Sequence, residues 1–170
     1  MTPGIDDLCN DILDRHHAYL HQALPLIHAQ LVHLSEDHPL RIAALGEARM
    51  VFEDLTHQLL SHLAKEENLL FTALDALAKA DREGTRLPAL PFPTVLHPIR
   101  MMEAEHARIL VAMDRLRQIT GGFIARQGAP DEWQECLSEL EALDADLRLH
   151  LRVENEVLFP LALEVERSLL

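Results

Sequence analysis

A histidine followed four residues later by a glutamate occurs twice in this sequence, each time before the same Leu-Phe dipeptide. The first pair is His62 and Glu66, and the second is His150 and Glu154. In an α-helix, residues i and i+4 lie on one face, one turn apart. Each pair can therefore offer an imidazole and a carboxylate to one metal ion. Both pairs lie in strongly apolar stretches, where a buried His or Glu must be paired, neutralised or bound to metal.

Two further histidines extend this pattern along the whole chain. Four histidines follow one another at intervals of 45, 44 and 44 residues: His17, His62, His106 and His150. In an antiparallel bundle, residues equally far from a turn lie at similar heights on consecutive helices. The midpoints of the intervals fall near Pro39, Gly84 and Gly128, in sequences typical of turns. We therefore expect the four histidines to meet in one site together with Glu66 and Glu154.

The chemistry of these six side chains is that of a metal site. Imidazole and carboxylate ligands suit iron, manganese or zinc, and two carboxylates that bridge suit a pair of ions. We expect two iron ions in a carboxylate-bridged non-haem centre, because redox chemistry favours iron, with zinc or manganese as substitutes. The alternative is that these are structural His–Glu pairs or solvent-facing residues, since two such pairs are not unusual among eleven histidines.

Other histidines and acids near these positions are weaker candidates. His21, one turn after His17, is either a further ligand or a hydrogen-bond partner of one, and Glu103, one turn before His106, offers the same choice. We expect the remaining histidines away from the metal or behind a ligand, at the surface, the rim or a helix start: His16, His28, His33, His57 and His97.

The elements that must position the six residues are helices. The chain is 48% hydrophobic but only 4% aromatic and has six glycines, which favours helices over sheets. Helical periodicity covers residue 5 to the low thirties, 40 to 80, 94 to 119 and 131 to 166. Pro25 predicts a kink or an early end in the first helix, and Pro160 predicts an irregular turn in the fourth. The pattern predicts an all-α, antiparallel, up-down-up-down four-helix bundle forming a single domain, residues 1–170.

Composition excludes several classes of function. A formal net charge of −13 argues against nucleic acid and against an anionic membrane surface as partners. Cys9 and Cys136 are too few and too distant to predict a disulfide scaffold or a zinc ribbon. The acidic start does not have the pattern of a signal peptide, and no run reaches the length of a membrane span. We expect a cytoplasmic protein, and the oligomeric state stays open.

Four stretches around these histidines carry a family resemblance. They are Arg15-His-His17 with Leu24-Pro25, His62-Leu-Ala-Lys-Glu66-Glu67-Asn-Leu-Leu-Phe71, Met102-Glu-Ala-Glu-His106, and His150-Leu-Arg-Val-Glu154-Asn-Glu-Val-Leu-Phe-Pro160. With them the chain resembles the hemerythrin-like, His-His-Glu (HHE) cation-binding family, and more closely the di-iron domain of the Repair of Iron Centres proteins, which repair iron–sulfur clusters. The resemblance implies that Glu66 and Glu154 bridge two irons, that the four histidines are terminal ligands, and that Glu105 lines the approach to the site.

Two features depart from that family. Its repair proteins begin with a small domain bearing paired cysteines, which this sequence does not match, so repair or nitric oxide chemistry that needs that domain is in doubt. A further family histidine aligns with His38. The hairpin pattern places His38 at a turn, about 20 residues from the site, which at 1.5 Å per residue is roughly 30 Å away. We therefore leave His38 out of the predicted site.

The leading functional prediction is a di-iron protein that handles dioxygen, nitric oxide or iron itself, in a stress response or in iron–sulfur cluster repair. Its expected partners are a small diatomic ligand and iron–sulfur proteins. One alternative is a di-iron oxidase, peroxidase or nitric oxide reductase, which needs a proton source such as Glu105 or Tyr19, although Tyr19 points to a different face from His17. Another is a helical interaction module without functional metal.

Overall fold

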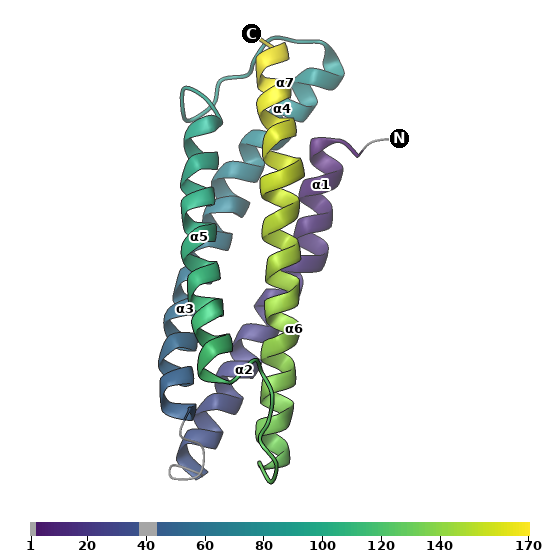
Figure 1. Cartoon of the computed structure of the whole chain (residues 1–170). Helices are drawn as coiled ribbons and strands as arrows, with labels where there is room; N and C mark the ends of the chain where they lie inside the picture. The colour runs from purple at the N-terminus through teal and green to yellow at the C-terminus, as the bar shows by residue number, and fades with distance from the viewer. Residues whose placement is uncertain (1–2, 38–43) are drawn as a thin grey trace.

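The protein, seen in a computed structural model, is described over residues 3–37 and 44–170 and forms four long antiparallel helices (Figure 1). The first consists of α1 (Ile5–Asp11), the π-helical turn η1 (Ile12–His17) and α2 (Ala18–Asp37). The second consists of α3 (Leu45–Lys65), the π-helical turn η2 (Glu66–Leu70) and α4 (Phe71–Glu83). The all-α bundle predicted from the sequence is confirmed.

The second half of the chain repeats this arrangement with one difference. The third long helix is α5 (Leu96–Ile119), which is α-helical throughout. The fourth consists of α6 (Asp131–Val153), the π-helical turn η3 (Glu154–Leu158) and α7 (Phe159–Ser168). In Figure 1 α1 and α7, the first and last helices of the chain, lie towards the same end of the bundle, as an up-down-up-down order of four helices requires. None of the described helices is long and apolar enough to cross a membrane.

The proline effects expected from the sequence are observed in part. The first helix does not end at Pro25, which is exposed, because Leu24 and Ile27 on either side are buried in the core and their packing outweighs one lost hydrogen bond. The fourth helix is irregular just before Pro160. The equivalent turn at Glu66–Leu70 has no proline after it, so a π-helical turn at this position does not require a proline. The predicted start of the second helix near residue 40 lies outside the described residues.

The core consists of two apolar clusters with the predicted site between them. One cluster contains residues such as Leu20, Leu63 and Leu147, and the other contains residues such as Leu70 and Phe159. Along each helix the predicted ligands lie where residues of one cluster give way to residues of the other. In the second helix, for example, His62 and Glu66 lie between Leu59 of the first cluster and Leu70 of the second. The six polar side chains therefore form a layer that is closed above and below by aliphatic and aromatic packing.

Gly84 ends α4 in the left-handed conformation, with a φ of 62°, close to the turn position deduced from the histidine spacing. Gly84→Ala should lower the free energy of unfolding by about 1–2 kcal/mol, because an alanine Cβ there has free space and the whole cost lies in the backbone. Gly46→Ala, inside α3 and also with free space, should raise it by about 0.5–1 kcal/mol. Urea denaturation of the two variants measures both changes in the free energy of unfolding. Changes of the same sign would contradict the left-handed conformation of Gly84 as the cause.

Candidate metal centre

All six predicted ligands are buried and come together in one layer of the bundle. The exposed fractions are at most 2% for the six residues: His17, His62, Glu66, His106, His150 and Glu154. η1 supplies the first histidine, and each of η2 and η3 begins at a glutamate that follows a histidine at the end of α3 or α6. A π-helical turn is wider than an α-turn and occurs frequently at functional sites. The third long helix supplies only His106.

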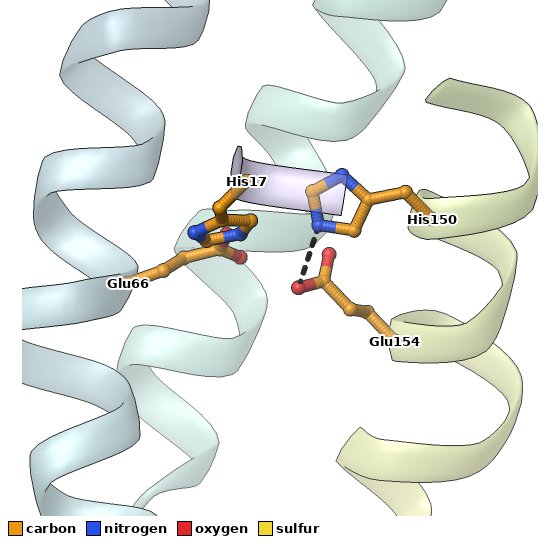
Figure 2. Close-up of side chains that lie close together, drawn as sticks. All are labelled: His17, Glu66, His150 and Glu154. Carbon is orange, nitrogen blue, oxygen red and sulfur yellow. Dashed lines mark ion pairs between the residues drawn. The ribbon is translucent and has the colours of Figure 1, made fainter. Parts of the chain in front are cut away.

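These residues form two groups of four that share both glutamates. His17 and His150 lie with Glu66 and Glu154 in one group, drawn in Figure 2, where the four side chains converge from three helices. His62 and His106 lie with the same two glutamates in the other group. In each group the candidate ligand atoms are within 4.8 Å of one another. We call these the His17/His150 position and the His62/His106 position.

Each carboxylate directs one oxygen to each position. Glu66 Oε2 lies 3.4 Å from His17 Nε2, whereas Glu66 Oε1 lies 3.3 Å from His62 Nε2. Glu154 Oε1 lies 3.1 Å from His150 Nε2, whereas Glu154 Oε2 lies 3.2 Å from His106 Nε2. This is the arrangement that two bridging carboxylates would need.

Hydrogen bonding within the protein does not satisfy this layer. Although the contacts just given, and the ion pair drawn in Figure 2, are as short as 3.1 Å, seven buried atoms of these four residues make no hydrogen bond to the described residues. They are Nε2 of His17, both ring nitrogens of His150 and both oxygens of Glu66 and Glu154. Buried polar atoms are almost always paired, and each unpaired one carries a free-energy cost. Nitrogen and oxygen atoms that converge without partners are a donor set for metal ions, so the residues present fit a metal pair.

The protonation states indicate what a metal ion must displace. Burial lowers the pKa of His106, but the carboxylates of Glu154 and Glu66 outweigh burial and raise the pKa to about 10. Burial lowers the pKa of His62, whose Nε2 lies 3.1 Å from that of His106. In the metal-free protein this raised pKa keeps His106 protonated at neutral pH.

Metal affinity should fall with decreasing pH for this reason. A metal ion binds neutral imidazole, so it must release the proton of His106 at any pH below about 10. Loss of one proton on binding changes the affinity about tenfold per pH unit, so the dissociation constant of zinc should rise about tenfold from pH 8 to pH 7. Titration calorimetry in buffers of different ionisation enthalpy measures the released protons. An affinity independent of pH would contradict this protonation state.

Three of the four histidines have a hydrogen-bond partner on the ring nitrogen that faces away from the site. His17 Nδ1 lies 2.9 Å from Glu67 Oε1, and His62 Nδ1 lies 3.1 Å from Glu105 Oε2. His106 Nδ1 lies 2.9 Å from the side-chain oxygen of Asn155. Such partners fix the ring, keep the proton on Nδ1 and make Nε2 a better ligand.

Two of these partners, Glu67 and Asn155, were not predicted from the sequence. Each directly follows a shared glutamate, at the second residue of a π-helical turn. The only sequence signal for these two partners is their shared position, directly after the glutamate of each His-x-x-x-Glu pair. Glu105 was predicted to line the approach; its carboxylate pairs with Lys65 and contacts His62, and Lys65 and His62 outweigh partial burial to lower its pKa.

The weaker candidates divide clearly. His21 is exposed and contacts Glu67 at 3.4 Å, so it lies behind His17 and not in the ligand groups, and Glu103 is exposed. Four other histidines were expected away from the metal, and the structure agrees, because each is exposed or half-buried: His28, His33, His57 and His97. The expectation for His16 was wrong, because it is 5% exposed and stacks on His150. His38 lies outside the described residues.

The fold and this site agree with comparison to known families. Residues 10–162 match the family model of the hemerythrin HHE cation binding domain. The chain therefore belongs to the hemerythrin HHE cation-binding family, and the buried His/Glu groups are consistent with a metal-binding member of it.

Among characterised proteins, the chain is similar to proteins named for iron–sulfur cluster repair. It is 28% identical over 159 residues to the iron-sulfur cluster repair protein YtfE of Edwardsiella ictaluri, covering 94% of this chain and 66% of that protein. It is 27% identical over 161 residues to DnrN of Neisseria gonorrhoeae, named likewise, covering 94% and 90%. It is 27% identical over 166 residues to YtfE of Yersinia pseudotuberculosis, covering 95% and 67%. The chain thus spans about two thirds of the length of the YtfE proteins.

Proposed function

We propose that the protein holds two iron ions bridged by Glu66 and Glu154, and that it serves in the repair of iron–sulfur clusters by supplying iron. The observation that carries the proposal is the pair of four-residue groups that share both carboxylates. His17 and His150 would hold one ion, and His62 and His106 the other. Iron–sulfur cluster repair is the function named for the relatives. Bound iron would supply transferable ions and electrons, and the burial of the six side chains would keep water away from them.

A second candidate function is reversible binding of dioxygen or nitric oxide at the same centre. Each metal position offers two imidazoles and a share of two carboxylates. Iron commonly accepts more ligands than four, so an exogenous diatomic molecule would have a coordination position available. The balance of four histidines and two glutamates suits either role.

The catalytic alternative has less support, because neither proposed proton source suits the task. Glu105 is held between Lys65 and His62, and its lowered pKa keeps it ionised at neutral pH, so it has no proton to give. Burial, with the carboxylates of Asp146 and Glu139, raises the pKa of Tyr19, and its hydroxyl makes no hydrogen bond to the predicted ligands.

Iron transfer to a damaged cluster tests the proposed function. The protein loaded with ferrous iron is mixed with an enzyme whose [4Fe–4S] cluster has lost one iron and has then been reduced by one electron, in the presence of a chelator that removes free iron. We expect enzyme activity to return while the protein loses iron, and we expect no effect from the metal-free protein. If enzyme activity recovered equally when free ferrous iron and chelator replaced the iron-loaded protein, the proposal would be contradicted. A spectral change with nitric oxide but no transfer would favour the second candidate.

A further inference from the structure

The two metal positions differ in how their histidines are supported. At the His62/His106 position both rings have an outer hydrogen-bond partner, a carboxylate for His62 and the amide oxygen of Asn155 for His106. At the His17/His150 position only His17 has one, from Glu67. His150 Nδ1 is buried and has no partner among the described residues.

His150 is supported by a ring stack instead. The imidazole of His16 lies parallel to it, with ring centroids 5.1 Å apart and an interplanar angle of 6°. His16 is itself held by Asp146, whose Oδ1 lies 2.8 Å from His16 Nδ1. The carboxylate of Asp146 thus reaches His16, and not His150 one turn further along α6.

A stack and a hydrogen bond do not support a ligand equally. Both fix the plane of a ring, but only an acceptor on Nδ1 selects the tautomer and increases the basicity of Nε2. With a metal ion on Nε2, His150 must keep its proton on a buried Nδ1 that no described protein atom accepts. Outer partners of this kind change metal affinity about 10- to 100-fold.

We propose that the two positions hold their ions unequally, so that the ion at the His17/His150 position is released first, and that His16 is the residue that positions His150. This inference rests on the proposed di-iron centre and adds which ion is transferable. A centre built in this way can give up one ion while Asn155 and Glu105 help the other position keep its own.

Iron release to a chelator tests the inference. Protein loaded anaerobically with ferrous iron is mixed with a ferrous-chelating dye, and absorbance is followed over time. We expect two phases of equal amplitude, each one iron per chain, with rates differing by at least about tenfold. His16→Ala should accelerate only the fast phase, about tenfold, whereas His16→Phe, which keeps a stacked ring, should leave both rates unchanged.

Asn155→Leu provides the opposite test. It removes the acceptor on His106 and should accelerate only the slow phase, about 10- to 100-fold. Asn68→Leu is the matched control, because Asn68 lies in the equivalent turn but is exposed and bonds only the backbone of Ala64. Release in a single phase, or acceleration of the slow phase by His16→Ala, would overturn the inference while leaving the di-iron centre intact. Loading of fewer than two irons would overturn the proposed function and this inference together.

Discussion

Replacing Glu66 with glutamine should remove both metal ions, whereas replacing His62 with alanine should remove one. The difference follows from the shared carboxylates: Glu66 belongs to both groups of ligands, and His62 to one. In the proposed centre, loss of this carboxylate charge would deprive both ions of a bridging oxygen. We therefore expect iron to fall from two per chain to near zero for Glu66→Gln and to about one for His62→Ala.

Metal analysis after gel filtration measures these contents. Glu103→Gln is the control, since Glu103 is an exposed acid on α5 that lies outside the ligand groups, and it should retain two irons. Equal losses for Glu66→Gln and His62→Ala would show that the carboxylate is not shared between two ions.

Removing the metal should lower the melting temperature by about 10–20 °C. The layer between the two apolar clusters contains six buried polar residues whose atoms have few partners within the protein, so ions that bind them stabilise the folded state. A ligand at about 100 times its dissociation constant adds about 2.7 kcal/mol per site. For a chain of this size, 1 kcal/mol corresponds to about 2–4 °C, and two sites together give the stated shift.

Scanning calorimetry of the loaded and chelator-treated protein measures this shift, with readdition of iron as the control for reversibility. A melting temperature that is the same with and without metal would mean that these side chains do not bind the ions. That result would support the alternative prediction of a helical interaction module without functional metal.

The histidine spacing predicted the height of the site because it depends only on helix geometry. Equal distances from successive turns place residues at one level whatever the details of packing. Gly84 and Gly128, near two of the deduced midpoints, have φ values of 62° and 81°, as turn glycines often do. The third midpoint, near Pro39, lies outside the described residues. Strong periodicity and clear turn residues were sufficient to predict the bundle.

The surroundings of the ligands could not be predicted in the same way. His16 and His17 are adjacent, and a regular α-helix turns consecutive side chains to different directions, so His16 was expected at the rim. Both are buried because they lie at the end of the π-helical turn η1, whose wider turn changes the direction of the side chains. Glu67 and Asn155, which follow the shared glutamates and are half-buried, also lie in π-helical turns. Helical periodicity does not distinguish a π-helical turn from an α-helical one, so these turns and the side chains that they reorient could not be predicted from the sequence.

The central claim is that Glu66 and Glu154 join two iron ions into one centre. It is tested most directly by measuring iron per chain together with the near-ultraviolet and visible spectrum of the oxidised, iron-loaded protein. We predict two irons per chain and an oxo-bridged charge-transfer band, both lost in the His62→Ala, His150→Ala double variant. Full iron content in that variant, or a wild-type protein with one iron and no such band, would contradict the claim.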